Sequence, residues 1–192
     1  MGKRFVGLGA VLAAAAAIAA SPAAAANIDC GPAGGIVTGT VTGSVTVGPG
    51  VTCVVAAAHV GGLVVQPGGA LVMLQTTVDR SVQSNGAAWI VLAGSNTVKG
   101  SVQIVGTAAI PPGLSSNAIC TTAVAGSLML SGNTAPFLVG CAAGAGNTLG
   151  SALISGNTGA VTFQFNTVTG SGLCGGTITG SGNTYGRKLG CP

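Results

Sequence analysis

The sequence predicts an all-β fold, a single-domain parallel β-helix whose coils stack on one another. Three observations support this prediction: a degenerate repeat, strand-like alternation within each repeat, and turn residues between the strands. The repeat is clearest in residues 96–104, Asn-Thr-Val-Lys-Gly-Ser-Val-Gln-Ile. Self-similarity at about twenty residues is typical of chains that stack copies of one structural unit. We expect right-handed coils, because crossovers between parallel strands are almost always right-handed.

The apolar residue that opens each repeat sets the expected register. It recurs at intervals of 19, 18, 20, 26, 25, 19 and 17 residues. The eight positions are Val41, Val60, Val78, Val98, Val124, Leu149, Val168 and Tyr185. Most coils therefore hold about 17–20 residues and two are longer. Coils spaced by the strand separation of about 4.8 Å give a rod roughly 35–40 Å long.

Short apolar strands alternate with turns inside each coil. Apolar and small polar side chains alternate over 41–47, residues 48–50 read Gly-Pro-Gly, and 51–55 begins another strand. Such alternation, rich in Val and Thr, is typical of strands, and glycine supplies the positive φ that corners require. No helix is expected after residue 26, because β-branched residues and glycine are dense there while Glu, Lys and Gln are scarce.

Residues 1–26 have the pattern of a cleaved signal peptide. Lys3 and Arg4 precede an apolar run of 16 residues, and residues 24–26 are the small residues that a signal peptidase requires. The run is shorter than the roughly 20 residues that span a bilayer. We therefore expect residues 27–192 to form one secreted or cell-envelope domain without a membrane span.

Charge is sparse after the expected leader. Two carboxylates and four cations give residues 27–192 a net charge of +2, and the chain has no glutamate. These residues are Asp29, Asp79, Arg80, Lys99, Arg187 and Lys188. So few cations form no stripe that tracks phosphates, so nucleic acid is not an expected partner. Self-association is expected, because so little charge repels a second copy of the chain.

All six cysteines lie in 27–192, and an even number in an oxidising compartment predicts disulfides. Cysteines one coil apart can bridge, because stacked strands lie as close as disulfide-bonded Cα atoms require. Cys174 and Cys191 each follow an opening apolar residue by six positions, which favours this pair. Spacing leaves the pairing of the others open, with Cys30–Cys53 and Cys120–Cys141 preferred. A zinc site is not expected, because the chain has one histidine and no C-x-x-C pair.

An Asn-Thr pair precedes the opening apolar position in four coils. The asparagines are Asn96, Asn147, Asn166 and Asn183. We expect them to occupy left-handed corner positions and to stack their amides along the rod. None lies in an N-x-S/T sequence, so glycosylation is not expected.

The chain is poor in catalytic chemistry. Glycan hydrolysis needs two carboxylates at a fixed separation, and Asp29 lies before the first coil, far in sequence from Asp79. His59 has no evident carboxylate partner in the sequence and is expected to be solvated. Calcium-repeat and phosphate-loop motifs are absent. We therefore expect no catalytic residue, no metal site and no cofactor.

Two features keep ligand binding open. Trp89 begins a strand, and an exposed ring there would stack on a sugar, although packing in the protein is the alternative. Threonines recur in 38–42 and 177–179, and stacked threonine arrays are what ice-binding solenoids use. Residues 63–65 and 101–103 occupy comparable places without threonine, so the sequence predicts no continuous array.

The two long coils contain insertions at 108–117 and 139–146. Insertions in neighbouring coils usually emerge on one side of a solenoid, and that side is often the binding side. The preferred interpretation is a loop held by Cys120–Cys141.

The phrase N-T-[VL]-x-G-S-[VA]-x-[IV], the segment 45–53 and the leader together resemble small secreted β-helix proteins of actinobacteria. The G-x-V-x-V pattern and the coil length also resemble bactofilin-type polymer-forming solenoids. The resemblance covers residues 38–185 and implies a β-helix. We expect a non-enzymatic structural or surface protein of the cell exterior. The alternatives are a binding module for a cell-wall glycan or another surface ligand and, third, a carbohydrate-active enzyme.

Overall fold

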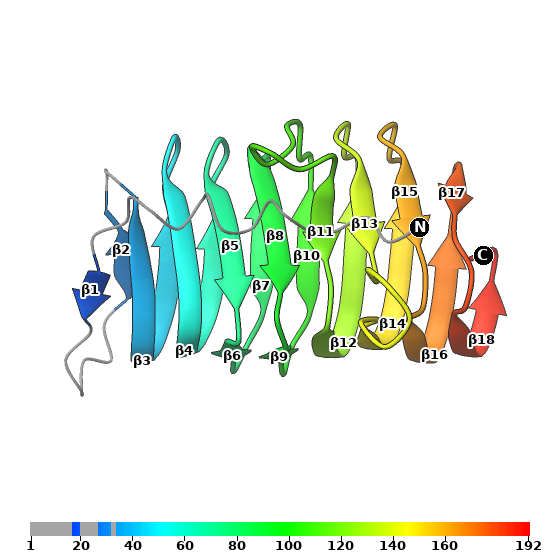
Figure 1. The fold of residues 1–192 in the computed structure, drawn as a ribbon, viewed down its shortest axis with the longest axis horizontal. Coiled ribbons are helices and arrows are strands. Elements are labelled where there is room, and N and C mark those ends of the chain that lie inside the picture. Colours follow the sequence, from blue (N-terminus) through cyan, green and yellow to red (C-terminus); the bar gives the residue numbers. More distant parts are fainter. Residues whose placement is uncertain (1–16, 20–26, 32–33) are drawn as a thin grey trace.

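The computed structural model describes residues 17–19, 27–31 and 34–192. These residues form a parallel β-solenoid of about eight coils and contain no helix (Figure 1). The all-β prediction is therefore confirmed. The handedness of the coil stays a prediction. The expected leader falls outside the described residues except for Ala17–Ala19.

Each strand is short, and several strands continue through a corner. In chain order they are β1 (Ala17–Ala19), β2 (Ile28–Cys30), β3 (Gly35–Val47), β4 (Thr52–Val65), β5 (Ala70–Leu74), β6 (Thr77–Val78), β7 (Val82–Asn85), β8 (Trp89–Ala93), β9 (Asn96–Val98), β10 (Val102–Val105), β11 (Asn117–Ile119), β12 (Thr122–Ser131), β13 (Phe137–Val139), β14 (Thr148–Ser155), β15 (Val161–Phe163), β16 (Thr167–Cys174), β17 (Ile178–Thr179) and β18 (Thr184–Leu189).

Parallel pairing between successive coils builds three faces along the rod. Face 1 contains 35–37, 52–56, 70–74, 89–93, 117–119, 137–139, 161–163 and 178–179. Face 2 contains 39–41, 58–60, 77–78, 96–98, 122–124, 148–149, 167–168 and 184–185. Face 3 contains 44–47, 62–65, 82–85, 102–105, 127–131, 151–155, 171–174 and 187–188. β1 extends face 1 and β2 extends face 3.

The expected register is confirmed at every opening position. Val41 pairs with Val60, Val60 with Val78, and the same pairing continues through all eight positions to Tyr185. Seven of these side chains are buried, while Tyr185 is half-buried. The apolar position was a reliable marker because an inward side chain in a stacked coil lies above its counterpart in the preceding coil.

The core is one continuous column of aliphatic and aromatic side chains from all three faces. Phe137, Phe163 and Leu128 are among its largest fully buried members. Burying a side chain of this size contributes about 1.5–3 kcal/mol. The alternation seen in the sequence arises because successive strand residues point into this core and out to solvent.

Left-handed backbone at the corner from face 1 to face 2 falls on residues other than asparagine. Ala57, Gln75, Ser95, Thr121 and Phe165 have φ between 47° and 65°. The prediction that the asparagines adopt the left-handed conformation is therefore wrong. At these corners the left-handed residue is the one just before the position that the asparagines occupy. This strained residue turns the next side chain inward.

Glycine at the corner from face 2 to face 3 is required by close stacking. A Cβ at Gly126 would lie 2.6 Å from Ser101 Oγ and 2.8 Å from the Gly100 carbonyl oxygen. The serine that follows the glycine links coils, because Ser101 Oγ accepts a hydrogen bond from the Ser127 N–H at 3.1 Å. The Gly-Ser step of the repeat thus encodes a tight corner.

The two insertions leave the rod at different corners. Residues 106–116 connect β10 to β11 between faces 3 and 1, whereas 140–147 connect β13 to β14 between faces 1 and 2. Figure 1 shows them at opposite ends of the face 1 strands. The two insertions therefore do not share one side of the rod. The second insertion is held by Cys120–Cys141, as the preferred interpretation required.

Candidate functional site

All three predicted disulfide pairs are present. The Cα–Cα separations are 5.8 Å for Cys30–Cys53, 5.4 Å for Cys120–Cys141 and 4.7 Å for Cys174–Cys191. They join positions 23, 21 and 17 residues apart, so each closes about one coil. The cysteines therefore fasten the first coil, the middle insertion and the last coil.

The Cys174–Cys191 pair forms by a different route from the predicted one. Val168 and Tyr185 are in register, but an irregularity follows before Ser171 pairs with Arg187. The chain then turns back, and Gly190 forms an antiparallel bridge to Leu173. This reversal brings Cys191 to Cys174 and interrupts the parallel edge that a further coil would need.

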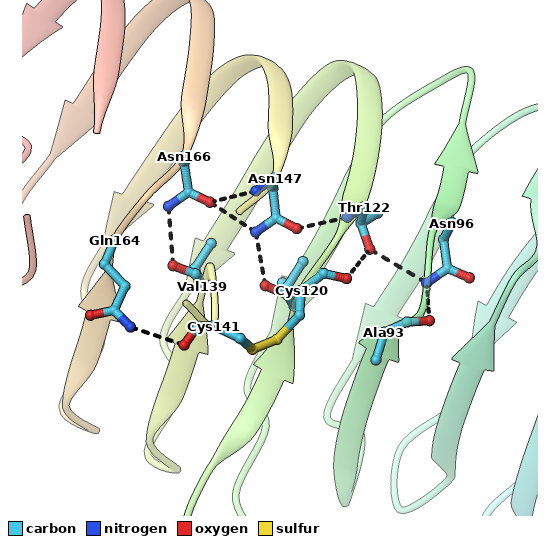
Figure 2. Close-up of a disulfide and its surroundings, with 10 residues drawn as sticks. Ala93, Asn96, Cys120, Thr122, Val139, Cys141, Asn147, Gln164 and Asn166 are labelled. Atoms are coloured by element: carbon cyan, nitrogen blue, oxygen red, sulfur yellow. Dashed lines mark hydrogen bonds between the residues drawn. A yellow bond between two sulfur atoms is a disulfide. The ribbon is translucent and has the colours of Figure 1, made fainter. Parts of the chain in front are cut away.

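A polar ladder runs inside the rod at the corner from face 1 to face 2 (Figure 2). Its consecutive members are hydrogen-bonded from coil to coil, and the first five are buried. They are Thr76, Asn96, Thr122, Asn147, Asn166 and Asn183. The stacked amides were predicted, and the structure confirms them while adding the two threonines.

Each ladder amide bonds to more than its neighbour. Asn147 Nδ2 donates to the Ile119 carbonyl and to Asn166 Oδ1, both at 2.8 Å. Asn147 Oδ1 accepts from the Thr122 N–H at 2.9 Å. Buried polar groups are stable only when they are paired, so this ladder fixes the backbone of several coils at once.

A second ladder was missed by the sequence analysis. At the corner from face 3 to face 1, Asn133 Oδ1 accepts from the Thr107 N–H at 2.8 Å, and Asn133 Nδ2 donates to Asn157 Oδ1 at 2.8 Å. The signal was the phrase Ser-Gly-Asn-Thr, which occurs at 131–134, 155–158 and 181–184. Its third copy belongs to the first ladder, so one phrase serves two corners.

His59, Asp79 and Lys99 form an exposed charged cluster on face 2. Asp79 Oδ2 lies 2.8 Å from His59 Nε2, and Asp79 Oδ1 lies 2.8 Å from Lys99 Nζ. The expectation that His59 lacks a carboxylate partner is wrong, because stacking brings residues one coil apart together. Hydrogen bonds from Lys99 and then from His59 lower the pKa of Asp79. All three side chains are exposed, so the cluster is a solvated surface feature.

Arg80 extends this polar region across three coils. Its Nε donates to the Gly61 carbonyl and its guanidinium donates to Ser44 Oγ, both at 3.0 Å. Asp79 and Arg80 form no ion pair with each other among the described residues. Arg80 therefore links neighbouring coils through side-chain hydrogen bonds.

Trp89 packs against protein. It points outward from face 1 and is 9% exposed, in a cluster with Ala70, Val91 and the insertion residue Leu114. The ring predicted as a possible sugar platform therefore presents little surface to a ligand. Tyr185 is half-buried, stacks on Phe163 with ring centroids 6.4 Å apart, and donates to the Pro192 carbonyl oxygen at 2.9 Å.

Face 3 has a shallow groove of about 440 Å³. Its polar lining consists mainly of carboxamides and its apolar lining of valine and proline. The residues are Val64, Val65, Gln66, Pro67, Gln83, Ser84, Asn85, Gln103 and Val105. Ser84 is buried, and its Oγ has no hydrogen-bond partner in the part of the chain that the structure describes. The groove offers neutral donors and acceptors beside apolar surface.

Face 2 has a column of outward threonines. Paired positions from coil to coil are Thr40, His59, Thr77, Thr97, Ala123, Thr148, Thr167 and Thr184. The segments 63–65 and 101–103, which were expected to occupy comparable places, belong to face 3 and to the corner before it. Six of the eight positions are threonine, and His59 and Ala123 interrupt the column, so the array is extensive but not continuous.

Among the described residues, no group of three or more His, Cys, Asp or Glu has the proximity to hold a metal ion. The same residues include no helix long and apolar enough to cross a membrane. Asp29 lies on β2 beside Thr46 on face 3, whereas Asp79 lies on face 2.

Comparison with protein-family models, curated proteins and solved structures found no match.

Proposed function

We propose that the protein is a non-enzymatic structural or surface protein that acts outside the cytoplasm as a rigid rod. The observation that carries the proposal is the set of three disulfides, each of which closes about one coil around a continuous core. Disulfides form and persist in oxidising compartments. The leader-like residues 1–26 point to the same destination.

The distribution of carboxylates favours a structural role over catalysis. Asp29 and Asp79 are the only acidic residues in the sequence, and they lie on different faces. Asp79 is already engaged by Lys99 and His59. Acid–base hydrolysis of glycans needs two carboxylates across one bond, so this arrangement does not support it.

The assembly state of the exported full chain tests the structural role. Light scattering and negative-stain microscopy would be performed on oxidised protein. Ordered lateral arrays or sheets of rods are expected, because weakly charged faces repel little while the reversal at Gly190 blocks growth at that end. A monodisperse monomer at high concentration would contradict self-assembly.

A glycan-binding module is the second candidate, favoured by the groove on face 3. Amides of Gln83, Gln103 and Asn85 can both donate to and accept from sugar hydroxyls, and Val64 offers apolar surface. Co-sedimentation with insoluble cell-wall polysaccharide tests this candidate. Replacing Gln83 and Gln103 with alanine should lower capture, whereas Ser115→Ala in the exposed insertion should not. Equal capture of both variants would contradict it.

A further inference from the structure

The Asn-Thr dipeptides of the repeat build two arrays at once. In 96–97, 147–148, 166–167 and 183–184, the asparagine points inward to the ladder and the threonine points outward. Each threonine is therefore held by a backbone whose preceding residue is hydrogen-bonded to the neighbouring coils. We call the outward threonines Thr97, Thr148, Thr167 and Thr184, with Ala123 between the first two, the threonine column.

Strand propensity does not explain the gathering of threonine on one face. Threonine suits strands because its β-branched side chain packs well on a pleated surface, and this preference acts on all faces. The outward position of face 1 instead reads Ile36, Val54, Val72, Val91, Ala118, Leu138, Thr162 and Thr179. That of face 3 reads Thr46, Val64, Gln83, Gln103, Met129, Leu153 and Leu173. The threonine column therefore distinguishes face 2.

The outward positions that follow the threonine column are small or hydroxyl-bearing from Ala123 onward, whereas Lys99 follows Thr97. Beside it lie Ala125, Gly150, Thr169 and Gly186, all small or hydroxyl-bearing. All four threonines are exposed, and the charged cluster is confined to the coils before Ala123. The threonine column is thus bordered on one side by small or hydroxyl-bearing residues from Ala123 to Thr184. A shallow hollow lies among Thr97, Ala123 and Thr148, and Phe165 precedes Thr167 on the other side.

The spacing of the threonine column is fixed by the stack. Neighbouring strands lie about 4.7–4.9 Å apart, and threonine has a restricted χ1. Hydroxyl and methyl groups therefore repeat at a regular interval with little side-chain freedom. That interval is close to the repeat of equivalent oxygen atoms along the a axis of hexagonal ice. Each contact with one threonine is weak, so a ligand that binds many of these evenly spaced side chains must have binding groups that repeat at the same interval, as a crystal lattice does.

We propose that the threonine column binds the surface of crystalline water. The hydroxyls replace hydrogen bonds of the lattice, and the methyl groups rest in the hollows between oxygen atoms. The rigid ladder behind the threonines lowers the entropy lost on binding, because little needs to be ordered. The proposal does not depend on the proposed location, since the array is a property of the folded rod.

Partition into ice tests the proposal. Oxidised full-chain protein would be frozen slowly on a cold finger, and its concentration in ice and in residual liquid would be compared. The wild-type chain is expected to be enriched in the ice. The double variant Thr148→Tyr and Thr167→Tyr should lose this enrichment, because two rings would protrude above the neighbouring threonines. Thr46→Tyr on face 3 is the matched control and should retain it.

A substitution that is expected to increase ice enrichment provides a second test of the proposal. Ala123→Thr completes the run from Thr97 to Thr184 at an exposed strand position and is expected to raise the enrichment. Circular dichroism confirms that each variant is folded. Exclusion of the wild-type chain from ice would overturn the proposal, as would equal losses in the double variant and Thr46→Tyr. Binding to crystalline cellulose or chitin without ice enrichment, lost in the same double variant, would overturn it in favour of a glycan lattice.

Discussion

Asn147 and Asn166 are joined twice across neighbouring coils. Asn166 Oδ1 accepts a hydrogen bond from Asn147 Nδ2 at 2.8 Å and from the Asn147 N–H at 3.2 Å. One amide oxygen therefore satisfies both a side-chain and a main-chain donor of the preceding coil. This double contact shows how the ladder holds neighbouring coils at a fixed distance and stabilises the corner.

Asn147→Ala should destabilise the fold by about 1–3 kcal/mol or more, because buried partners would lose their hydrogen bonds. The Thr122 N–H would be left unpaired, and the Ile119 carbonyl would keep only its bond from the Gly140 N–H. Urea unfolding of the oxidised protein measures the change. Asn85→Ala at an exposed position is the control and should stay within about 0.5 kcal/mol of wild type. Equal effects of the two substitutions would contradict a buried ladder.

Gly126→Ala should cost about 1–3 kcal/mol, because its Cβ would crowd Ser101 Oγ and the Gly100 carbonyl of the neighbouring coil. Gly175→Ala is the matched control, since the nearest atom to its Cβ would be the Ile154 carbonyl oxygen at 4.0 Å. Thermal unfolding followed by circular dichroism compares the two. A Gly126→Ala protein as stable as the Gly175→Ala protein would refute the steric account of the Gly-Ser corner.

Thr107→Val should stabilise the protein by about 1 kcal/mol, because Thr107 Oγ1 is buried without a hydrogen-bond partner among the described residues. The backbone bond from Thr107 to Asn133 is unaffected by the change. Thr122→Val is the opposite case, since the Thr122 hydroxyl donates to the Cys120 carbonyl at 3.1 Å. Urea unfolding should place the two variants on opposite sides of wild type, and destabilisation by both would contradict the assignment.

Tyr185 should ionise at a higher pH than an ordinary tyrosine. Burial raises its pKa to about 12 from the usual 10.0, and it is the only tyrosine, so ultraviolet absorbance reports it alone. A raised folded-state pKa contributes stability that is complete below pH 10 and is lost as the pH rises through 12. Tyr185→Phe should abolish the absorbance change. A midpoint near the usual value would show that the ring is more solvated than the structure places it.

Asp79 should titrate below the usual aspartate range, because Lys99 and His59 both bind its carboxylate. A lowered folded-state pKa contributes stability above the ordinary aspartate value, and that contribution fades as the pH falls through the lowered value. Carbon NMR of the carboxyl group measures the midpoint. Lys99→Ala should raise the pKa more than His59→Ala, since Lys99 is the larger cause. The reverse order would contradict this ranking.

The sequence predicted the stacked architecture well because register in a solenoid depends on local spacing. Each inward position, such as Val98, must lie over its counterpart one coil away, so a repeated valine records a contact in space. The same logic favoured Cys30–Cys53 and Cys120–Cys141, although spacing alone left their pairing open until the structure showed it. A long sequence separation is thereby reduced to one coil.

The features that the sequence analysis missed depend on which face a residue occupies. Thr97 and Gln103 lie in the same repeat phrase but point out from faces 2 and 3, so comparing them across coils concealed the threonine column. His59 and Asp79 are twenty residues apart, and only the stacking of one coil on the next makes them partners. The cover over Trp89 comes from an insertion whose path no periodic pattern specifies.

The intact mass of the exported full chain, alkylated without prior reduction, tests the central claim most directly. The account predicts a product of residues 27–192 with no alkylated thiol, since all six cysteines are paired. A product that retains residues 1–26 in the cytoplasm, or one whose cysteines react with the alkylating agent, would contradict a disulfide-stapled rod that acts outside the cell.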